Sequence, residues 1–246
     1  MAEHEITCWH IYHSGTAFFS PINNNLHIFD FSRQKDSKFP GSWLNNYQIT
    51  STFIYVTHGH SDHFNQEIFS WGNKLPETTY ILSTDVKNKT KKNAKQSKSF
   101  NFMQPGDNLK LSNIEIRAYG STDEGVSFLV KNSHFSTFHS GDLNWWAWKS
   151  FSEKERKREA REYKQIINKL KDKNIDLAFV PVDPRLEENY YLAGKYFLEN
   201  IEPKIMIPIH MGSDYSAAAK FIENHGKRST HIPEINEPGQ KFKFSL

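Results

Sequence analysis

The chain has 246 residues, a formal net charge of +3 and one cysteine, Cys8. A charge this small does not by itself indicate nucleic-acid binding, and a single cysteine excludes an internal disulfide. A helix needs about 20 consecutive apolar residues to cross a bilayer, and no apolar run in the sequence approaches that length. Residues 1–5 lack the features of a signal peptide. We therefore expect a cytoplasmic protein without a membrane partner, folded as a single domain over residues 1–246.

Short strands separated by turns are predicted over residues 6–31, because turn-forming residues stand at positions 14–15 and 21–25. His13 lies beside the first of these turns, where its ring faces either a core or a cavity. The last strand of this region begins at Leu26 and closes at Asp30. A polar and aromatic loop is predicted over residues 32–52.

The apolar run at residues 53–56 predicts a buried strand, and it leads directly into Thr-His-Gly-His-Ser-Asp-His at residues 57–63. Alternate side chains of an extended chain share a face, so His58 and His60 are expected to point the same way. Asp62 and His63 begin the next turn. Imidazole and carboxylate groups are ligands that Zn²⁺ takes in proteins. This spacing therefore favours a metal site over a polar loop with three unrelated histidines.

A short helix over residues 64–71 and a strand over residues 79–83 are predicted next. Residues 87–98 then contain six lysines and no acidic residue. Such a run is typical of a solvated face, and it could also attract a phosphorylated or polyanionic substrate. We favour the solvated face, because no aromatic residue stands between the lysines to stack on bases.

Three further strands are predicted at residues 114–119, 126–131 and 134–139, the last leading into Ser-Gly-Asp at 140–142. Strand alternation places His139 on the opposite face from Asp142, which indicates a structural histidine. Trp145 and Trp146 follow within a tryptophan-rich segment. These rings could cap a core or wall a substrate pocket, and we take them as the pocket pair.

The remaining elements alternate between helices and strands. Ser152 begins a capping box for a helix that reaches residue 171, and further helices are predicted at 187–199 and 215–225. Buried strands at 176–183 and 204–210 end in Asp183 and His210. Asp183 could form a turn pair with Arg185, or both could contact a substrate carboxylate or phosphate.

The segment from His58 to His63 resembles the H-x-H-x-D-H motif of the metallo-β-lactamase superfamily. The resemblance implies an α/β fold, a four-layer αββα sandwich of two mixed β-sheets flanked by helices. It also implies two divalent metal ions, Zn²⁺, Mn²⁺ or Fe²⁺. Its metal ligands correspond here to His58, His60, Asp62, His63, Asp142 and His210. His13 resembles a histidine that lies beside the metal loop in relatives, and Asp30 resembles the aspartate that braces this loop by hydrogen bonds.

One position departs from the family pattern. The connection at residues 120–125 normally supplies a third histidine to the first metal, and here it contains none. Either Asp123 or Glu124 takes that place, or the first metal site is incomplete. We favour Asp123, although a turn-forming aspartate is an equal alternative. A carboxylate ligand would favour harder ions such as Mn²⁺ or Fe²⁺.

The resemblance implies a hydrolase of the lactonase-like branch, in which a metal-bound hydroxide attacks a small ester, lactone or phosphoester, and this substrate could be anionic. Asp62 is the predicted catalytic residue, which orients the water and accepts its proton. The alternatives are a metal-poor binding protein on the same fold and a phosphodiesterase or nuclease. We expect a small-molecule partner instead of nucleic acid, because no added nucleic-acid domain is evident, and a homo-oligomer is left open.

Overall fold

A computed structural model of the chain describes residues 5–32, 42–90, 100–111 and 113–246. Contacts divide it into two compact units. The first unit contains residues 1–103 and 236–246, and the second contains residues 104–235. The organisation as a single domain stays a prediction. Within the described residues, no helix is long and apolar enough to span a membrane.

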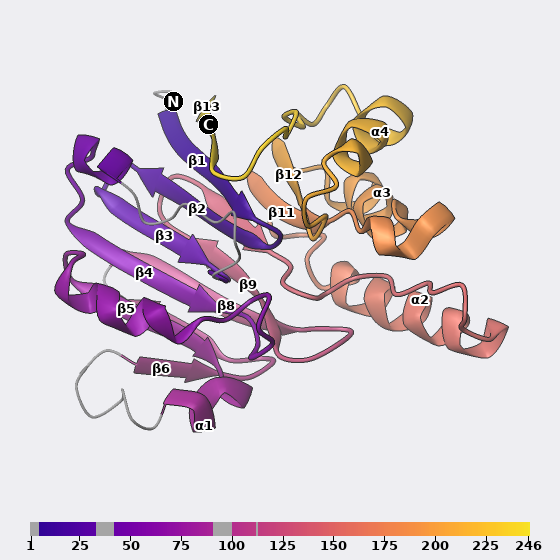
Figure 1. Cartoon of the computed structure of the whole chain (residues 1–246), viewed down its shortest axis with the longest axis horizontal. Coiled ribbons are helices and arrows are strands. Elements are labelled where there is room, and N and C mark those ends of the chain that lie inside the picture. Colours follow the sequence, from indigo (N-terminus) through magenta and orange to yellow (C-terminus); the bar gives the residue numbers. More distant parts are fainter. Residues whose placement is uncertain (1–4, 33–41, 91–99, 112) are drawn as a thin grey trace. The chain divides into compact units, whose positions relative to one another are not determined.

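The first unit is built on a mixed sheet of seven strands in the order β13-β1-β2-β3-β4-β5-β6 (Figure 1). The pairs from β13 to β3 are antiparallel, whereas those from β3 to β6 are parallel. Parallel neighbours bring their carboxyl ends to the same edge of the sheet, so the segments after β3, β4 and β5 meet there. The strands are β1 Glu5–Tyr12, β2 Gly15–Ser20, β3 Asn25–Phe29, β4 Ser51–Val56, β5 Thr78–Ser83, β6 Phe100–Met103 and β13 Gln240–Ser245.

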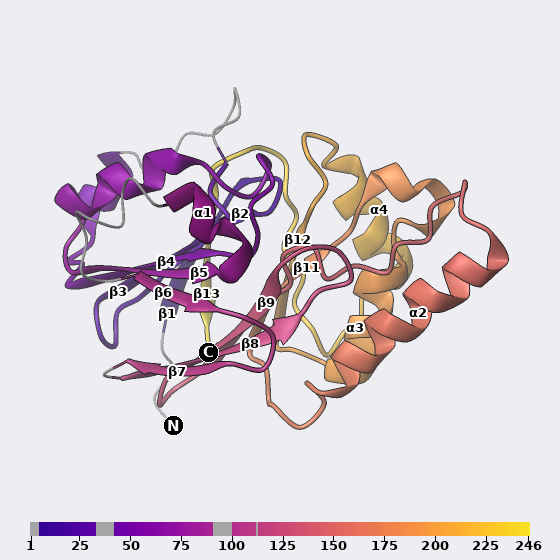
Figure 2. The same cartoon turned by 90° about the horizontal axis from the view of Figure 1, so that it is seen from below.

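Short helices lie on one face of this sheet (Figure 2). Ile68 and Trp71 belong to the buried apolar cluster there, and the Tyr80 hydroxyl donates a hydrogen bond to the Ile68 carbonyl at 2.9 Å. The helix predicted at residues 64–71 is a 3₁₀ helix that begins two residues later. The helices are η1 Ser42–Asn46, η2 Gln66–Asn73, η3 Thr84–Val86 and α1 Lys87–Thr90. Most of the predicted lysine run, from 91 to 98, and part of the predicted loop, from 33 to 41, lie outside the described residues.

A buried histidine stands in an aromatic stack of the same sheet. The His27 ring stacks on Phe18 and Phe53, with centroid separations of 4.3 and 5.0 Å. Its Nδ1 lies 3.1 Å from the Tyr55 hydroxyl. Burial lowers the pKa of His27 from 6.5 to about 3. The ring is therefore neutral in the folded protein at every pH above that value.

This burial predicts a loss of stability in acid. Between pH 6.5 and 3 the unfolded chain protonates at His27 and the folded chain does not, so acid favours unfolding. We expect the free energy of unfolding of the wild type to fall relative to that of His27→Phe by about 1.4 kcal/mol per pH unit. Urea unfolding at pH 7, 6, 5 and 4 measures this slope. His134→Phe, at an exposed position, is the control. Equal slopes for wild type and His27→Phe would contradict the expectation.

The second unit contains a mixed sheet of six strands in the order β12-β11-β10-β9-β8-β7. The pairs from β7 to β10 are antiparallel, and those from β10 to β12 are parallel. The carboxyl ends of β10, β11 and β12 therefore share one edge. The strands are β7 Asn108–Leu111, β8 Ile114–Gly120, β9 Val126–Lys131, β10 Ser136–His139, β11 Leu177–Pro181 and β12 Ile205–Ile209.

The helices of the second unit pack beside β11 and β12 (Figure 1). Tyr163 of the first of these helices is buried and donates a hydrogen bond to the Ala193 carbonyl at 2.9 Å. Ser152 and Glu155 form the predicted capping box. The helix predicted at 187–199 corresponds to the end of η4 and most of α3, with a turn at residues 190–191 between them, and Glu187 has a positive φ of 52° that kinks η4 itself. The helices are α2 Glu153–Asn168, η4 Pro184–Asn189, α3 Leu192–Ile201 and α4 Ser216–His225.

The predicted fold class, two mixed β-sheets flanked by helices, is confirmed. The predicted buried strands are present, with ends that shift by one or two residues. The sequence reasoning missed three strands, β6, β7 and β13. Each is the last strand at an edge of its sheet and, among the described residues, pairs with one neighbour. Such strands are short or partly exposed, so they lack the apolar runs that identify the central strands.

Candidate functional site

The histidine motif follows β4 directly. His58 Nε2 lies 3.0 Å from His60 Nδ1, which agrees with the expectation that these two rings point the same way. The His58 and His63 ring centroids are 4.1 Å apart. His58 and His63 are fully buried, whereas His60 is exposed. The motif thus brings three imidazoles together at the end of one strand.

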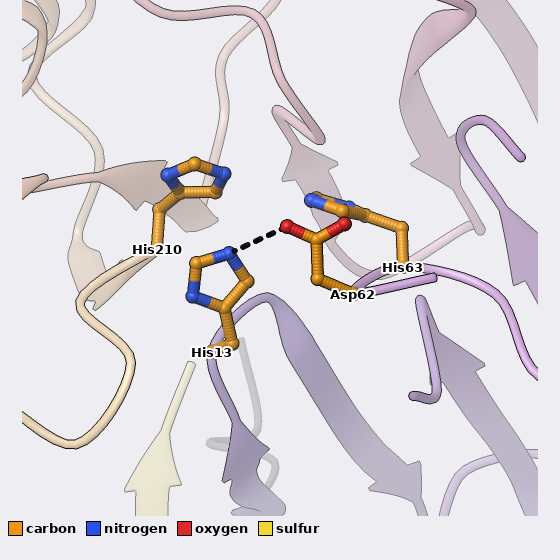
Figure 3. A group of neighbouring side chains, drawn as sticks. All are labelled: His13, Asp62, His63 and His210. Carbon is orange, nitrogen blue, oxygen red and sulfur yellow. Dashed lines mark ion pairs between the residues drawn. The ribbon is translucent and has the colours of Figure 1, made fainter. Parts of the chain in front are cut away.

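His13, from the turn between β1 and β2, joins this group. Its Nε2 lies 3.5 Å from the Asp62 carboxylate, and in Figure 3 these two side chains point toward each other with His63 alongside. One ligand-type atom from each of the three residues lies within 4.8 Å of the others. The hydrogen bond with His13 holds the pKa of Asp62 well below its usual range. Asp62 is therefore ionised at neutral pH, as a metal ligand must be.

Asp30 accepts three hydrogen bonds, two from Thr57 and one from His63. Its fully buried carboxylate accepts from the Thr57 amide at 2.8 Å, from the Thr57 hydroxyl at 2.6 Å and from His63 Nδ1 at 2.8 Å. Because a carboxylate accepts at Nδ1, the proton of neutral His63 is placed there and Nε2 is left with its lone pair. These are the bracing contacts that the resemblance implies for Asp30.

The second unit places Asp142 next to His210. Asp142 follows β10 through Gly141, whose φ of 55° lies in the left-handed region. His210 follows β12, and its Nε2 lies 2.9 Å from Asp142 Oδ1. Both residues are almost fully buried. Since β10 and β12 both neighbour β11, their ends lie close enough to bring the carboxylate and the imidazole together.

Asp183 supports His210 much as Asp30 supports His63. It follows β11 and is fully buried, and its Oδ2 lies 3.0 Å from His210 Nδ1. Arg185 donates to the same carboxylate from Nε, at 3.0 and 3.2 Å, and from Nη2 at 2.8 Å. Burial by itself would raise the pKa of Asp183, but the hydrogen bonds from His210 and Arg185 lower it to about 2. Burial likewise opposes the charged form of His210, yet Asp142 and Asp183 raise its pKa.

These contacts predict the effect of removing the Asp183 charge. Asp183→Asn keeps the shape of the side chain but replaces one accepting oxygen by an amide that donates. We expect it to lower the free energy of unfolding by about 2 kcal/mol, because hydrogen bonds to a buried charged group are lost. Chemical denaturation measures the change, with the exposed Asp172→Asn as the control. An effect no larger than that of Asp172→Asn would contradict the expectation.

The three tryptophans near Asp142 have different surroundings. Trp146 is buried, meets the His210 ring edge to face at 5.7 Å and stacks on Trp148 at 5.8 Å. Trp145 packs against Tyr163 of α2, as a residue that caps a core does. Of the predicted pocket pair, only Trp146 thus contacts a predicted ligand within its unit. The sequence reasoning did not single out Trp148, which also lies 5.8 Å from the Arg185 guanidinium.

Asp123 and His139 lie outside the groups of ligand-type side chains that the described residues form. The Asp123 side chain is exposed, and among the described residues it belongs to no cluster of three or more ligand-type side chains. Its role as a ligand stays a prediction. His139 is buried in β10, and its Nδ1 accepts a hydrogen bond from the Gly141 amide at 3.1 Å, which is the structural role expected from the sequence.

Three residues of the candidate site have left-handed backbone conformations. Eight described residues other than glycine have positive φ angles, and three of them are His13, Asp30 and His210. Such a conformation costs of order 1 kcal/mol or more for a residue with a β-carbon, and it is common where function constrains the backbone. The hydrogen bonds of Asp30 and His210 offset this cost.

The ligand-type residues fit a divalent metal ion. Imidazole nitrogen and carboxylate oxygen are the atoms that Zn²⁺, Mn²⁺ and Fe²⁺ accept from proteins. In each unit one histidine has a buried carboxylate at Nδ1, Asp30 for His63 and Asp183 for His210. That arrangement is typical of metal-binding histidines, because the carboxylate orients the ring and leaves Nε2 to bind the metal.

No protein-family model and no curated protein matches the sequence. Solved structures do match. Igni18, a metallo hydrolase from the archaeon Ignicoccus hospitalis, superposes with a TM-score of 0.69 at 13% identity, over 98% of this chain and 99% of Igni18. The metallo-β-lactamase fold protein YhfI from Bacillus subtilis gives 0.61 at 13% identity, over 98% and 100%.

A third structure, the short form of human tRNase Z, gives a TM-score of 0.52 at 9% identity, over 96% of this chain and 98% of the nuclease. Matches of this kind establish the fold. This chain is a metallo-β-lactamase-fold protein, as its histidine motif predicts. A fold does not by itself determine an activity, so the activity of this chain must be argued from its own residues.

Proposed function

We propose that the chain is a metal-dependent hydrolase that acts on a small ester, lactone or phosphoester. The observation that carries the proposal is the pair of buried carboxylates, Asp30 and Asp183, each at Nδ1 of a predicted metal ligand. Burying a carboxylate costs free energy unless it is fully hydrogen-bonded, and here it orients a histidine whose Nε2 is turned to other ligand-type groups. The similarity in fold to Igni18 supports the same class of reaction.

The proposal assigns ligands to two metal ions, as the resemblance implies. From the first unit the ligands would be His58, His60, Asp62 and His63, and from the second Asp142 and His210, with Asp123 as a further candidate. When bound, such ions supply Lewis acidity and lower the pKa of a water molecule. His13 was expected only beside the site, but its closeness to Asp62 and His63 makes it a further candidate ligand.

The chain's own residues then have distinct tasks. The ionised Asp62 carboxylate orients the attacking water and accepts its proton, and His13 fixes the position of that carboxylate. Trp146 shields His210 from solvent. The Arg185 side chain is 49% exposed, and its positive charge suits a substrate that carries a carboxylate or phosphate. We also propose that the protein acts in the cytoplasm.

Two alternatives make different predictions. A metal-poor binding protein is favoured by the lack of a histidine at residues 120–125. A nuclease is suggested by the similarity in fold to human tRNase Z, although only the fold supports it. Metal content separates the first alternative from the proposal, and a comparison of nucleic-acid with small-molecule substrates separates the second.

The test begins with the metal content of protein purified without added metal or chelator, and then reloaded with Zn²⁺, Mn²⁺ or Fe²⁺. We expect two metal ions per chain in at least one condition. Hydrolysis of an ester, lactone or phosphodiester should then be lost with a chelator and restored by the metal. His60→Ala should lower the metal content, whereas His134→Ala, at another exposed histidine, should not. One metal or none in every condition would overturn the two-metal proposal.

A further inference from the structure

Gly59, between His58 and His60, is held by a neighbouring segment of the first unit. Strands β4 and β5 are parallel, with Val56 opposite Leu82. Gly59 lies three residues beyond Val56, and Asp85 lies three residues beyond Leu82. The two segments that leave the sheet side by side therefore bring Asp85, in η3, to Gly59. Lys89 follows one helical turn later, in α1.

Asp85 and Lys89 bind opposite sides of the same residue. Asp85 Oδ2 accepts a hydrogen bond from the Gly59 amide at 2.7 Å, and Lys89 Nζ donates a hydrogen bond to the Gly59 carbonyl. The amide belongs to the peptide that joins His58 to Gly59, and the carbonyl belongs to the peptide that joins Gly59 to His60. Each of the two peptides between the paired histidines is thus fixed by its own charged side chain.

The close approach explains why a glycine stands at this position. A β-carbon on Gly59 would lie 2.9 Å from Lys89 Nζ, 3.1 Å from Asp85 Oδ2 and 3.2 Å from a Val86 methyl carbon. All three distances are shorter than ordinary van der Waals contact, so a larger residue would displace these side chains. The φ of Gly59 is not in the left-handed region, so the requirement is one of space.

We propose that Asp85 and Lys89 are positioning residues that clamp the peptides on either side of Gly59 and so set the spacing of His58 and His60 for metal binding. This inference rests on the proposed metal site. Asp85 and Lys89 are exposed at the surface. Their charged groups nevertheless contact the backbone of Gly59, which is buried. The two rings that the clamp would hold are 3.0 Å apart at their closest nitrogens. Lys89 thus has a specific role that the expected solvated lysine face does not explain.

The experiment compares Zn²⁺ affinity, measured by competition with a chelator, in full-length variants. We expect Asp85→Ala and Lys89→Met each to weaken Zn²⁺ binding by about 10-fold, the lower end of the range for groups that support metal ligands. Asp85→Asn and Lys89→Arg retain an accepting oxygen and a donating group, and they should recover most of the affinity. Lys87→Met removes a charge from the same helix without touching Gly59 and should match the wild type. Thermal unfolding of each metal-free variant checks that it folds.

A second measurement does not depend on metal. Hydrogen exchange at the Gly59 amide of the metal-free chain should be slow in the wild type and at least about 10-fold faster in Asp85→Ala, because the hydrogen bond to Oδ2 is lost. If the wild type binds Zn²⁺ and Asp85→Ala and Lys89→Met bind it with the same affinity, the clamp would be overturned and the proposed function would stand. A wild type that binds no metal would overturn the proposed function and the effect on affinity. The exchange rate would then decide whether the clamp itself exists.

Discussion

On a substrate found by the hydrolase screen, Asp62→Ala is expected to lower kcat/KM by about 100-fold or more, the range typical of general acid–base groups. The carboxylate is held by His13 and is ionised at neutral pH, so it can both bind a metal and orient the water that loses a proton. Steady-state kinetics with fully metal-loaded protein measures the loss. The metal content of each variant is determined in parallel, because loss of metal alone would also lower activity.

Two further variants test the roles of Asp62 and Asp123 separately. Asp62→Asn keeps one oxygen for a metal but accepts no proton, so it should retain more metal than Asp62→Ala and still lose activity. Asp123→Ala tests the predicted first-metal ligand and should remove one ion per chain. Full activity in Asp62→Ala would disprove the catalytic role. Two ions in Asp123→Ala would show that the first metal does not need this residue.

Asp30→Ala is expected to lower the free energy of unfolding by about 4 kcal/mol, because three hydrogen bonds to one buried carboxylate disappear together. The Thr57 amide and hydroxyl and the His63 Nδ1 proton all lose their acceptor. Alanine also tolerates the left-handed φ of 45° less well than aspartate does. Chemical denaturation of the metal-free protein measures the change.

The matched variant for this prediction is Asp30→Asn, which keeps one accepting oxygen and tolerates left-handed backbone. It should lose about half as much stability as Asp30→Ala. Asp172→Ala, at an exposed aspartate, should change little. Zn²⁺ affinity should also fall by about 10- to 100-fold in Asp30→Ala, since His63 is no longer oriented. An unfolding free energy within about 1 kcal/mol of the wild type would contradict the bracing role.

The positions of the strand ends explain why the substitutions with large expected effects on activity, metal affinity and stability involve few residues. Asp30, the histidine motif and Asp85 follow three adjacent strands, β3, β4 and β5. Asp142, Asp183 and His210 follow three adjacent strands of the other sheet, β10, β11 and β12. In each unit the parallel strands deliver polar side chains to one edge, while the strands themselves remain apolar and buried. Substitutions within the strands should therefore affect stability, and substitutions at their ends should affect the site.

The sequence by itself determined the features that depend on near neighbours along the chain. Apolar runs identified the central strands, and the capping box at Ser152 identified the start of α2. The spacing of His58, His60, Asp62 and His63 identified the motif and, through its resemblance, the fold. These features could be predicted because their physical causes, strand alternation and helix capping, act within a few residues.

The resemblance already implied that Asp30 braces the motif, but only the tertiary structure decided the contact of Asp183 with His210 and the contact of Asp85 with Gly59. Asp30 and His63 are 33 residues apart, Asp183 and His210 are 27 apart, and Asp85 and Gly59 are 26 apart. Asp183 was expected to pair with Arg185 or to contact substrate, and its bond to His210 was not foreseen. The role of Lys89 was hidden in a run of lysines. Such contacts depend on which strands are neighbours in the sheet, and the pattern within one strand does not specify its neighbours.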